Sequence, residues 1–331
     1  MTAVPDHWRG PLLLLGLWWT AITIFFHRDA AHMLSIWWSS STYNHIMIIP
    51  PLIAWLVAQR AALIAALRPV PWWPGAGLVA TAGLVWMAGA ATDIALLRHS
   101  GTVLMLLAAV AAALGPILVR ALAFPLGYAL FLIPFGDEVV PHFQHGTAQM
   151  CMLLLKLAGI PASLDGLFIT APSGQFVVAE ACSGVMFLVA MAAFATLAAH
   201  LCFRSWKRRL VFVGAALATT VIANGLRAFG TILIAENLGH EYARGADHLV
   251  YGWVFFACVL VAVMLVARRW FDRPADDAAI DIGGLNSTPR FVAGKVAIAA
   301  VVLGVLAMVL ISGSAAAGGA RAIADRVIET R

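Results

Sequence analysis

Long runs of apolar residues recur along nearly the whole of this 331-residue chain. A helix needs roughly 17–25 apolar residues to cross the hydrocarbon core of a bilayer, and short runs suffice where flanking side chains snorkel. Nine candidate runs cover residues 11–26, 46–58, 74–91, 101–115, 120–134, 183–201, 210–235, 249–267 and 292–312. Hydrophobic residues make up 62% of the chain and charged residues only 11%, too few to cover a water-soluble fold. The sequence therefore predicts an all-α, polytopic transmembrane helix bundle of about 8–9 spans.

Domain organisation follows from the even spread of these runs, since no Gly/Ser-rich or Pro-rich linker leads to a second large domain. We expect a single transmembrane domain over residues 1–312, followed by a short extracytoplasmic tail at 313–331. The formal net charge of +5 does not indicate nucleic-acid binding, because helical membrane proteins collect Lys and Arg in their cytoplasmic loops.

The distribution of basic residues sets the predicted topology. If the N-terminus is cytoplasmic and residues 146–159 do not cross the membrane, the basic cluster at 204–209 and the pair Arg268–Arg269 both lie on the cytoplasmic side. Residues 135–182 then form one extracytoplasmic region, with 146–159 at the membrane interface. Within this region, Ile169–Val178 reads as a short β-hairpin around a Pro-Ser-Gly turn.

Three reactive side chains are predicted to lie at the same depth in the membrane. Measured from the cytoplasmic clusters at about 1.5 Å per helical residue, Cys182 lies roughly 33 Å from Arg204. Arg227 lies about 27 Å along the next predicted helix, and His248 about 30 Å from the inner end of the one after it. Consecutive helices are frequent neighbours, so we expect the three side chains near the outer surface, on the helices at 183–267.

This combination suits acyl transfer. A cysteine thiolate is a strong nucleophile, and a nearby histidine can take the thiol proton and later protonate a leaving amine. An arginine can stabilise the negative charge on an attacked carbonyl oxygen. The structural alternatives are a small core cysteine and a Cys151–Cys182 disulfide. Arg227 fits a structural reading less well, because a charge deep in an apolar helix is costly, and Asn224 lies on the same helical face.

Three stretches resemble one known family. They are Val178-Ala179-Glu180-Ala181-Cys182-Ser183-Gly184-Val185, Asn224-Gly225-Leu226-Arg227 and Asp247-His248-Leu249-Val250-Tyr251-Gly252-Trp253, preceded by Ser41-Thr42-Tyr43-Asn44-His45. Over residues 10–270 the chain resembles the exosortases, bacterial polytopic transpeptidases related to archaeosortases, and it is most similar to the type A exosortases associated with exopolysaccharide gene clusters. One departure is Ile46, which follows His45 where the family often has glycine.

The resemblance implies roles for individual residues. Cys182 would be the nucleophile that carries a thioester, His248 the acid and base, and Arg227 the stabiliser of the tetrahedral intermediate. The supporting residues would be Glu180, Ser183, Asn224 and Asp247, while His45 either lines the site or is an interfacial polar residue.

The resemblance also implies the biological setting. Substrates would be exported proteins with a C-terminal signal made of a Pro-Glu-Pro motif, a transmembrane helix and a basic tail, which would be cleaved and passed to an acceptor in the cell envelope. The acidic motif could meet Arg227 or Arg244. We expect a multi-pass protein of the bacterial inner membrane, in contact with membrane lipid, with its site facing the periplasm and with no cofactor or metal.

Other functional classes stay open at this point. A transporter could use Arg227, Asp247 and His248 to bind an anion or relay protons. A metalloprotease could use His240, Glu241 and His248, but the His-Glu-x-x-His pattern is absent from the sequence. A scaffold without catalysis would leave the shared depth of Cys182, Arg227 and His248 unexplained.

Overall fold

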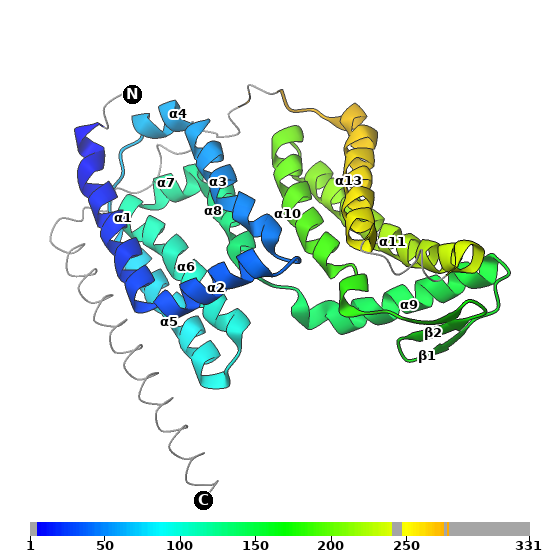
Figure 1. Ribbon diagram of the computed structural model, residues 1–331. Coiled ribbons are helices and arrows are strands. Elements are labelled where there is room, and N and C mark those ends of the chain that lie inside the picture. The colour runs from blue at the N-terminus through cyan, green and yellow to red at the C-terminus, as the bar shows by residue number, and fades with distance from the viewer. Residues whose placement is uncertain (1–4, 240–246, 275–276, 278–331) are drawn as a thin grey trace, which may run out of the picture. The chain divides into compact units, whose positions relative to one another are not determined.

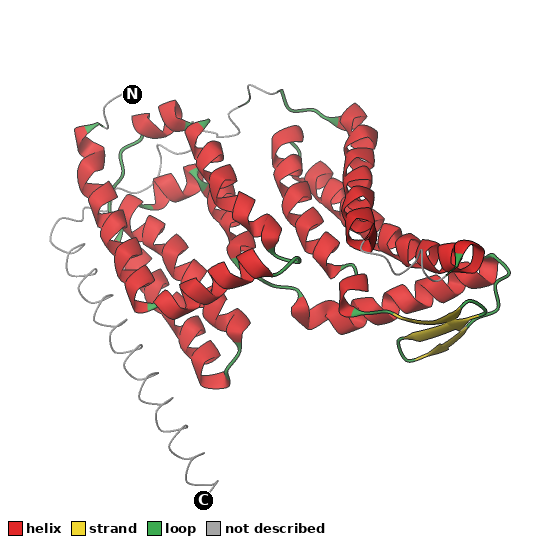
Figure 2. Cartoon of the chain, viewed as in Figure 1, coloured by secondary structure: helices red, strands yellow, loops and turns green. Residues whose placement is uncertain are grey.

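The computed structural model describes residues 5–239, 247–274 and 277, and within this part the side chains of residues 247–251 are not described. Helices make up 79% of the described residues, and the strands of this part form one three-stranded sheet (Figure 2). Six described helices are long and apolar enough to span a membrane, or up to eight spans if two pairs of shorter helices each count as one. The predicted all-α polytopic bundle is therefore confirmed, while the run at 292–312 and the tail lie outside the described residues.

Two compact units make up the described chain. The first contains residues 5–40 and 44–134, and the second contains residues 41–43, 135–239, 247–274 and 277. The helices of the first unit are α1 (Asp6–Phe25), α2 (His27–Ser39), η1 (Asn44–Ile48), α3 (Ile49–Ala58), α4 (Ala61–Ala66), α5 (Trp73–Thr92), α6 (Ala95–Leu114), α7 (Pro116–Ala121), α8 (Ala123–Tyr128) and η2 (Ala129–Leu132). The predicted run at 120–134 is thus three short helices.

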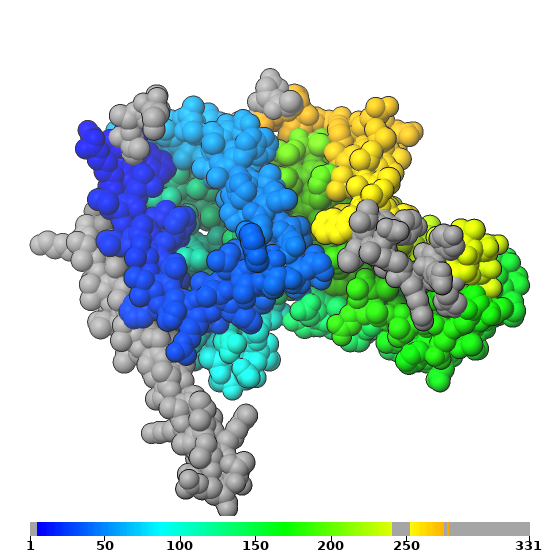
Figure 3. Space-filling view, viewed as in Figure 1, coloured from blue at the N-terminus to red at the C-terminus, as the bar shows by residue number. Residues whose placement is uncertain are grey.

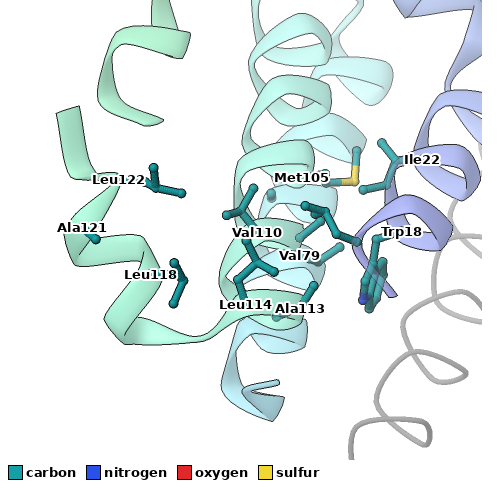
Figure 4. Close-up of a cluster of buried hydrophobic side chains, with 14 of the residues drawn as sticks. Trp18, Ile22, Val79, Met105, Val110, Ala113, Leu114, Leu118, Ala121 and Leu122 are labelled. Carbon is teal, nitrogen blue, oxygen red and sulfur yellow. The ribbon is translucent and has the colours of Figure 1, made fainter. Parts of the chain in front are cut away.

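The apolar core of the first unit lies among α1, α5 and α6. Trp18 and Ile22 of α1 pack with Val79 of α5 and Met105 of α6, all of them almost completely buried (Figure 4). Helices α5 and α6 approach closely at Gly101, which has no side chain. A Cβ atom added there would lie 2.6 Å from the Cβ atom of Trp86. Small residues at such contacts are a general device of helix packing in membranes.

Helix α2 is an element that the apolar runs did not predict. It carries charged and polar residues, and it bends by 109° into the segment Asn44–Ala58 at a short break. Its apolar residues are interrupted by Arg28, Asp29 and His32, so a search for long apolar runs passes over it.

The second unit is organised around one long helix. It contains η3 (Asp137–Val139), α9 (Val140–Leu157), β1 (Ser163–Asp165), β2 (Phe168–Ala171), β3 (Gly174–Val177), η4 (Glu180–Cys182), α10 (Val185–Cys202), α11 (Trp206–Leu238), α13 (Asp247–Ala267) and η5 (Arg268–Trp270) (Figure 1). Helix α11 has 33 residues, hence a length of about 50 Å, and it packs against α9, α10 and α13. Helix α13, yellow to orange in Figure 3, lies beside α10, where the rings of Phe187 and Phe256 stack at 4.9 Å between centroids.

The predicted hairpin is present. Strands β2 and β3 pair antiparallel, with Ile169 opposite Phe176 and Ala171 opposite Gly174, and β1 adds a third strand that the sequence pattern did not predict. The turn is tied to α11, because the backbone N–H of Ser173 donates to Glu236 at 2.8 Å. Buried Ile169 packs in one apolar cluster with Ile232 of α11.

Candidate functional site

The segment around Cys182 is a tight turn between the sheet and α10. Cys182 ends η4, and its backbone N–H donates to the carbonyl of Ala179 at 2.8 Å. Gly184 follows with φ of 83° and precedes the first residue of α10. A Cβ atom at Gly184 would lie 2.5 Å from Cγ of Asn224, so both the left-handed backbone and the close packing against α11 require glycine here.

Asn224 fixes this turn to two helices. The side chain is 4% exposed, and its Nδ2 donates to the carbonyl of Cys182 at 2.9 Å and to Oγ1 of Thr147 at 3.1 Å. The Thr147 hydroxyl in turn donates to the carbonyl of Ser183 at 3.4 Å. Helices α9 and α11 therefore both hold the backbone on either side of the thiol.

Arg227 lies one turn further along α11 and is 6% exposed. One terminal nitrogen donates to the carbonyl of Ala181 at 3.5 Å, and the guanidinium carbon lies 5.3 Å from the ring centroid of Phe187. Among the described side chains, no carboxylate forms an ion pair with this arginine. A buried cation that contacts a carbonyl and an aromatic face is well placed to meet negative charge on a ligand.

Helix α13 approaches the same arginine. A Cβ atom at buried Gly252 would lie 2.9 Å from Nη1 of Arg227, which shows that this face of α13 is turned toward the guanidinium. His248 stands four residues earlier in the same helix. The side chains of Asp247 and His248 lie outside the described part of the chain.

A cavity of about 200 Å³ opens beside Arg227 in the second unit. Glu180 and Asp137 bring carboxylates to its wall, and Gly252 lines it from α13. Ala181 and Ser183, the neighbours of Cys182, also line the cavity, whereas partly buried Cys182 packs against the apolar cluster that holds Cys151 and Ile169. The cavity therefore touches the turn that carries the thiol and the guanidinium.

The segment 41–43 contributes to the same unit. Ser41 and Thr42 line the cavity, and the hydroxyl of Tyr43 donates to Oδ1 of Asp137 at 2.8 Å. Burial and this hydrogen bond raise the pKa of Tyr43 above its ordinary value, so the phenol stays protonated and remains a donor. His45 lies two residues later in η1, within the other unit.

Several contacts were not predicted from the sequence. Thr147 and Phe187 look like ordinary residues of apolar helices, and their roles depend on helix rotation, which hydropathy does not fix. Asp137 begins the short helix η3 after Gly136, and no sequence motif singled it out. For Tyr43 a signal did exist, since it belongs to the stretch that carries the family resemblance.

The four cysteines of the described chain are free, so the Cys151–Cys182 disulfide is not formed. No group of three or more His, Cys, Asp or Glu side chains in the described residues is arranged to hold a metal ion. His240 and Glu241 lie outside the described residues.

Comparison with known proteins identifies the family. Residues 37–265 match the family described as transmembrane exosortase, which is more than half of the chain. No curated protein and no solved structure gave a match. The matched stretch includes the Cys182 turn, Arg227 and the first turns of α13. The family supports a general role as a membrane transpeptidase or protease, and the apolar helices support a membrane-embedded protein. The chain therefore belongs to the transmembrane exosortase family.

Proposed function

We propose that this protein is a cysteine transpeptidase that cleaves exported proteins near a C-terminal sorting signal. The observation that carries the proposal is the buried Arg227, which contacts the Cys182 turn and has no ionic partner among the described side chains. An unpaired buried charge costs several kcal/mol, and such residues within membrane segments usually serve function. A developing oxyanion would supply the missing counter-charge.

In the proposed reaction, His248 takes the proton from the Cys182 thiol, and the thiolate attacks the scissile carbonyl carbon. The negative charge that moves to the carbonyl oxygen meets the guanidinium of Arg227. The carbon–nitrogen bond then breaks, His248 returns the proton to the leaving amine, and an acyl thioester remains on Cys182. Attack by an acceptor nucleophile releases the product and restores the thiol.

The remaining site residues act on this machinery indirectly. Asn224 and Thr147 hold the backbone carbonyls of Cys182 and Ser183, which fixes the direction of the turn. Glu180 belongs to the cavity wall, and we assign Asp247 and His45 supporting roles from the resemblance alone. Cys182 is partly buried among apolar side chains, surroundings in which a thiol needs a base to become nucleophilic.

The substrates in this proposal carry the tripartite signal of the family: a Pro-Glu-Pro motif, a transmembrane helix and a basic tail. The motif would lie outside the membrane near the cavity, and the tail would stay in the cytoplasm. In this proposal the protein lies in the bacterial inner membrane, its site faces the periplasm, and the acceptor belongs to the cell envelope. Family membership does not favour the transporter alternative.

The test is to trap the acyl-enzyme. The protein is co-expressed with a substrate that bears such a signal, and intact-protein and peptide mass spectrometry are used to search for an acyl adduct on Cys182. We expect the adduct and the cleaved product with the wild-type protein, and neither with Cys182→Ala. Cys202→Ala, which removes a free cysteine at the end of α10, is the matched control and should leave both signals intact. Normal cleavage by Cys182→Ala would refute the proposal.

A further inference from the structure

A second cavity in the same unit has a different character from the candidate site. It is an apolar groove of about 670 Å³ between the first half of α11 and the last turns of α13. Six of its lining residues are Val211, Ala215, Thr219, Ala262, Val266 and Trp270. Val211, Val266 and Trp270 are each more than half exposed, so the groove is open along its length.

One end of the groove is basic. Lys207 and Arg208 both line it, and the segments 203–209 and 268–277 together contain seven basic residues against three acidic ones. Arg208 pairs with Asp272 at 3.0 Å, yet its side chain remains 55% exposed. Trp270 stands at the same end with the guanidinium of Arg269 over its ring, and tryptophan is typical of the membrane–water interface. The groove is therefore amphiphilic: cationic at one end and apolar beyond it.

The length of the groove limits what can fill it. Its lining on α11 stops at Thr219, 13 residues after the helix begins at Trp206, a distance of about 20 Å. One leaflet is about half of the roughly 30 Å hydrocarbon core, so the groove has the depth of a single leaflet. A transmembrane helix would cross both leaflets and need a longer track.

The positive charge at the basic end also distinguishes between the candidate occupants of the groove. The basic tail of the proposed substrate carries the same sign of charge as Lys207 and Arg208. So do Arg290, just before the apolar run at 292–312, and Lys295, within it. Either segment would bring like charges together at the basic end, which is unfavourable. An anionic headgroup would instead be attracted there, as it is at basic pockets between transmembrane helices.

We propose that this groove is a binding site for an anionic glycerophospholipid, with one acyl chain along Ala215 and Ala262 and the phosphate headgroup at Lys207 and Arg208. The proposal is independent of the catalytic assignment, because none of these residues lines the cavity beside Arg227. Such a lipid would fill the gap between α11 and α13 and so support the position of both helices.

The experiment is native mass spectrometry of the purified full-length protein, titrated separately with phosphatidylglycerol and with phosphatidylcholine of the same acyl chains. We expect one tightly retained phosphatidylglycerol and a clear preference over phosphatidylcholine. Lys207→Gln should reduce that preference about fivefold, since one basic residue near the surface contributes about that much. Lys156→Gln, which removes a lysine from α9, is the matched control and should leave the preference unchanged.

Filling the groove tests the acyl-chain part of the proposal. Ala215→Phe and Ala262→Phe each place a ring in the groove at an exposed position, so a folding failure of one variant leaves the other to decide. Both should lose the retained lipid while Gly214→Phe, on exposed α11 with open space around it, keeps it. Equal retention of both lipids by the wild type, or retention unchanged by both filling variants, would overturn the proposal. So would a photo-crosslinker at residue 215 that captures a polypeptide instead of lipid.

Discussion

Arg98 in the first unit and Arg227 in the second both belong to apolar membrane helices, but their surroundings differ. In the first unit, Arg98 of α6 pairs with Asp29 at 3.3 Å and with Asp93 at 3.1 Å, and Asp29 also accepts from the indole of Trp86. In the second unit, Arg227 is more deeply buried and has only a carbonyl and an aromatic ring as described partners. A cation that is already neutralised holds the fold together, whereas one that is left unpaired is available to a ligand.

The largest expected effect is therefore on activity at Arg227. Arg227→Lys keeps the charge but loses the planar fork, and it should lower substrate processing by about 100-fold or more, as removal of an oxyanion donor does elsewhere. The rate is measured by co-expression with a tripartite-signal substrate, at matched protein levels. Wild-type processing by this variant would make Arg227 a structural residue and remove the contrast between the two units.

The counterpart experiment is Arg98→Gln in the first unit. This change leaves buried Asp29 without its cation and should lower the free energy of unfolding by roughly 2 kcal/mol, less than for a fully buried pair because Arg98 is 27% exposed at its side chain. Thermal unfolding in detergent measures the loss, and processing per folded molecule should stay close to wild type. A large loss of activity without a loss of stability would mean that Arg98, too, has a functional role.

Gly252 offers a way to disturb the guanidinium without removing it. Gly252→Val places a Cβ atom 2.9 Å from Nη1 of Arg227, too close for an unstrained contact. We expect processing to fall by about tenfold, because small misplacements of catalytic groups are costly. Gly214→Val, on the open surface of α11, is the control and should retain activity. Equal rates for the two valine variants would contradict the close approach of α13 to Arg227.

A smaller effect is expected at Asn224. Asn224→Ala removes the donor to Cys182 and Thr147 and should cost about 1–2 kcal/mol of stability, with a drop in processing because the turn loosens. Asn237→Ala, which removes an exposed amide bonded only to its own helix, should have little effect on either property. If both variants behave alike in thermal unfolding and in processing, the Cys182 turn does not depend on α11.

The smallest effect should come from Tyr43→Phe, which removes one hydrogen bond to Asp137 at the wall of the cavity. We expect a loss of about 1 kcal/mol in stability and a modest change in processing. Because the pKa of Tyr43 is raised, the hydroxyl stays protonated through neutral pH. The difference in stability between Tyr43→Phe and the wild type should therefore be the same from about pH 6 to about pH 9. A difference that disappears at the alkaline end would show that the phenol ionises there.

The sequence predicted the second unit better than the first. Apolar runs identify α10, α11 and α13, and counting residues from basic clusters places Cys182 and Arg227 at one level, where the turn and the guanidinium indeed meet. The rotation of each helix about its axis could not be predicted, because hydropathy does not show that Asn224 faces Thr147 or that Gly252 faces Arg227. In the first unit, charged residues hide α2 from a search for apolar runs, and Pro125 lies just after the break at Leu122 that divides the run at 120–134.

The central claim is that Cys182 and residue 248 share one site, and disulfide trapping tests it most directly. In a variant with Cys151, Cys202 and Cys258 replaced by Ala, the change His248→Cys is combined with Cys182 and a mild oxidant, and the bond is detected by mass spectrometry. The proposed site predicts rapid bond formation, and no bond from Val254→Cys, which lies exposed on α13. Trapping by Val254→Cys but not by His248→Cys would contradict it.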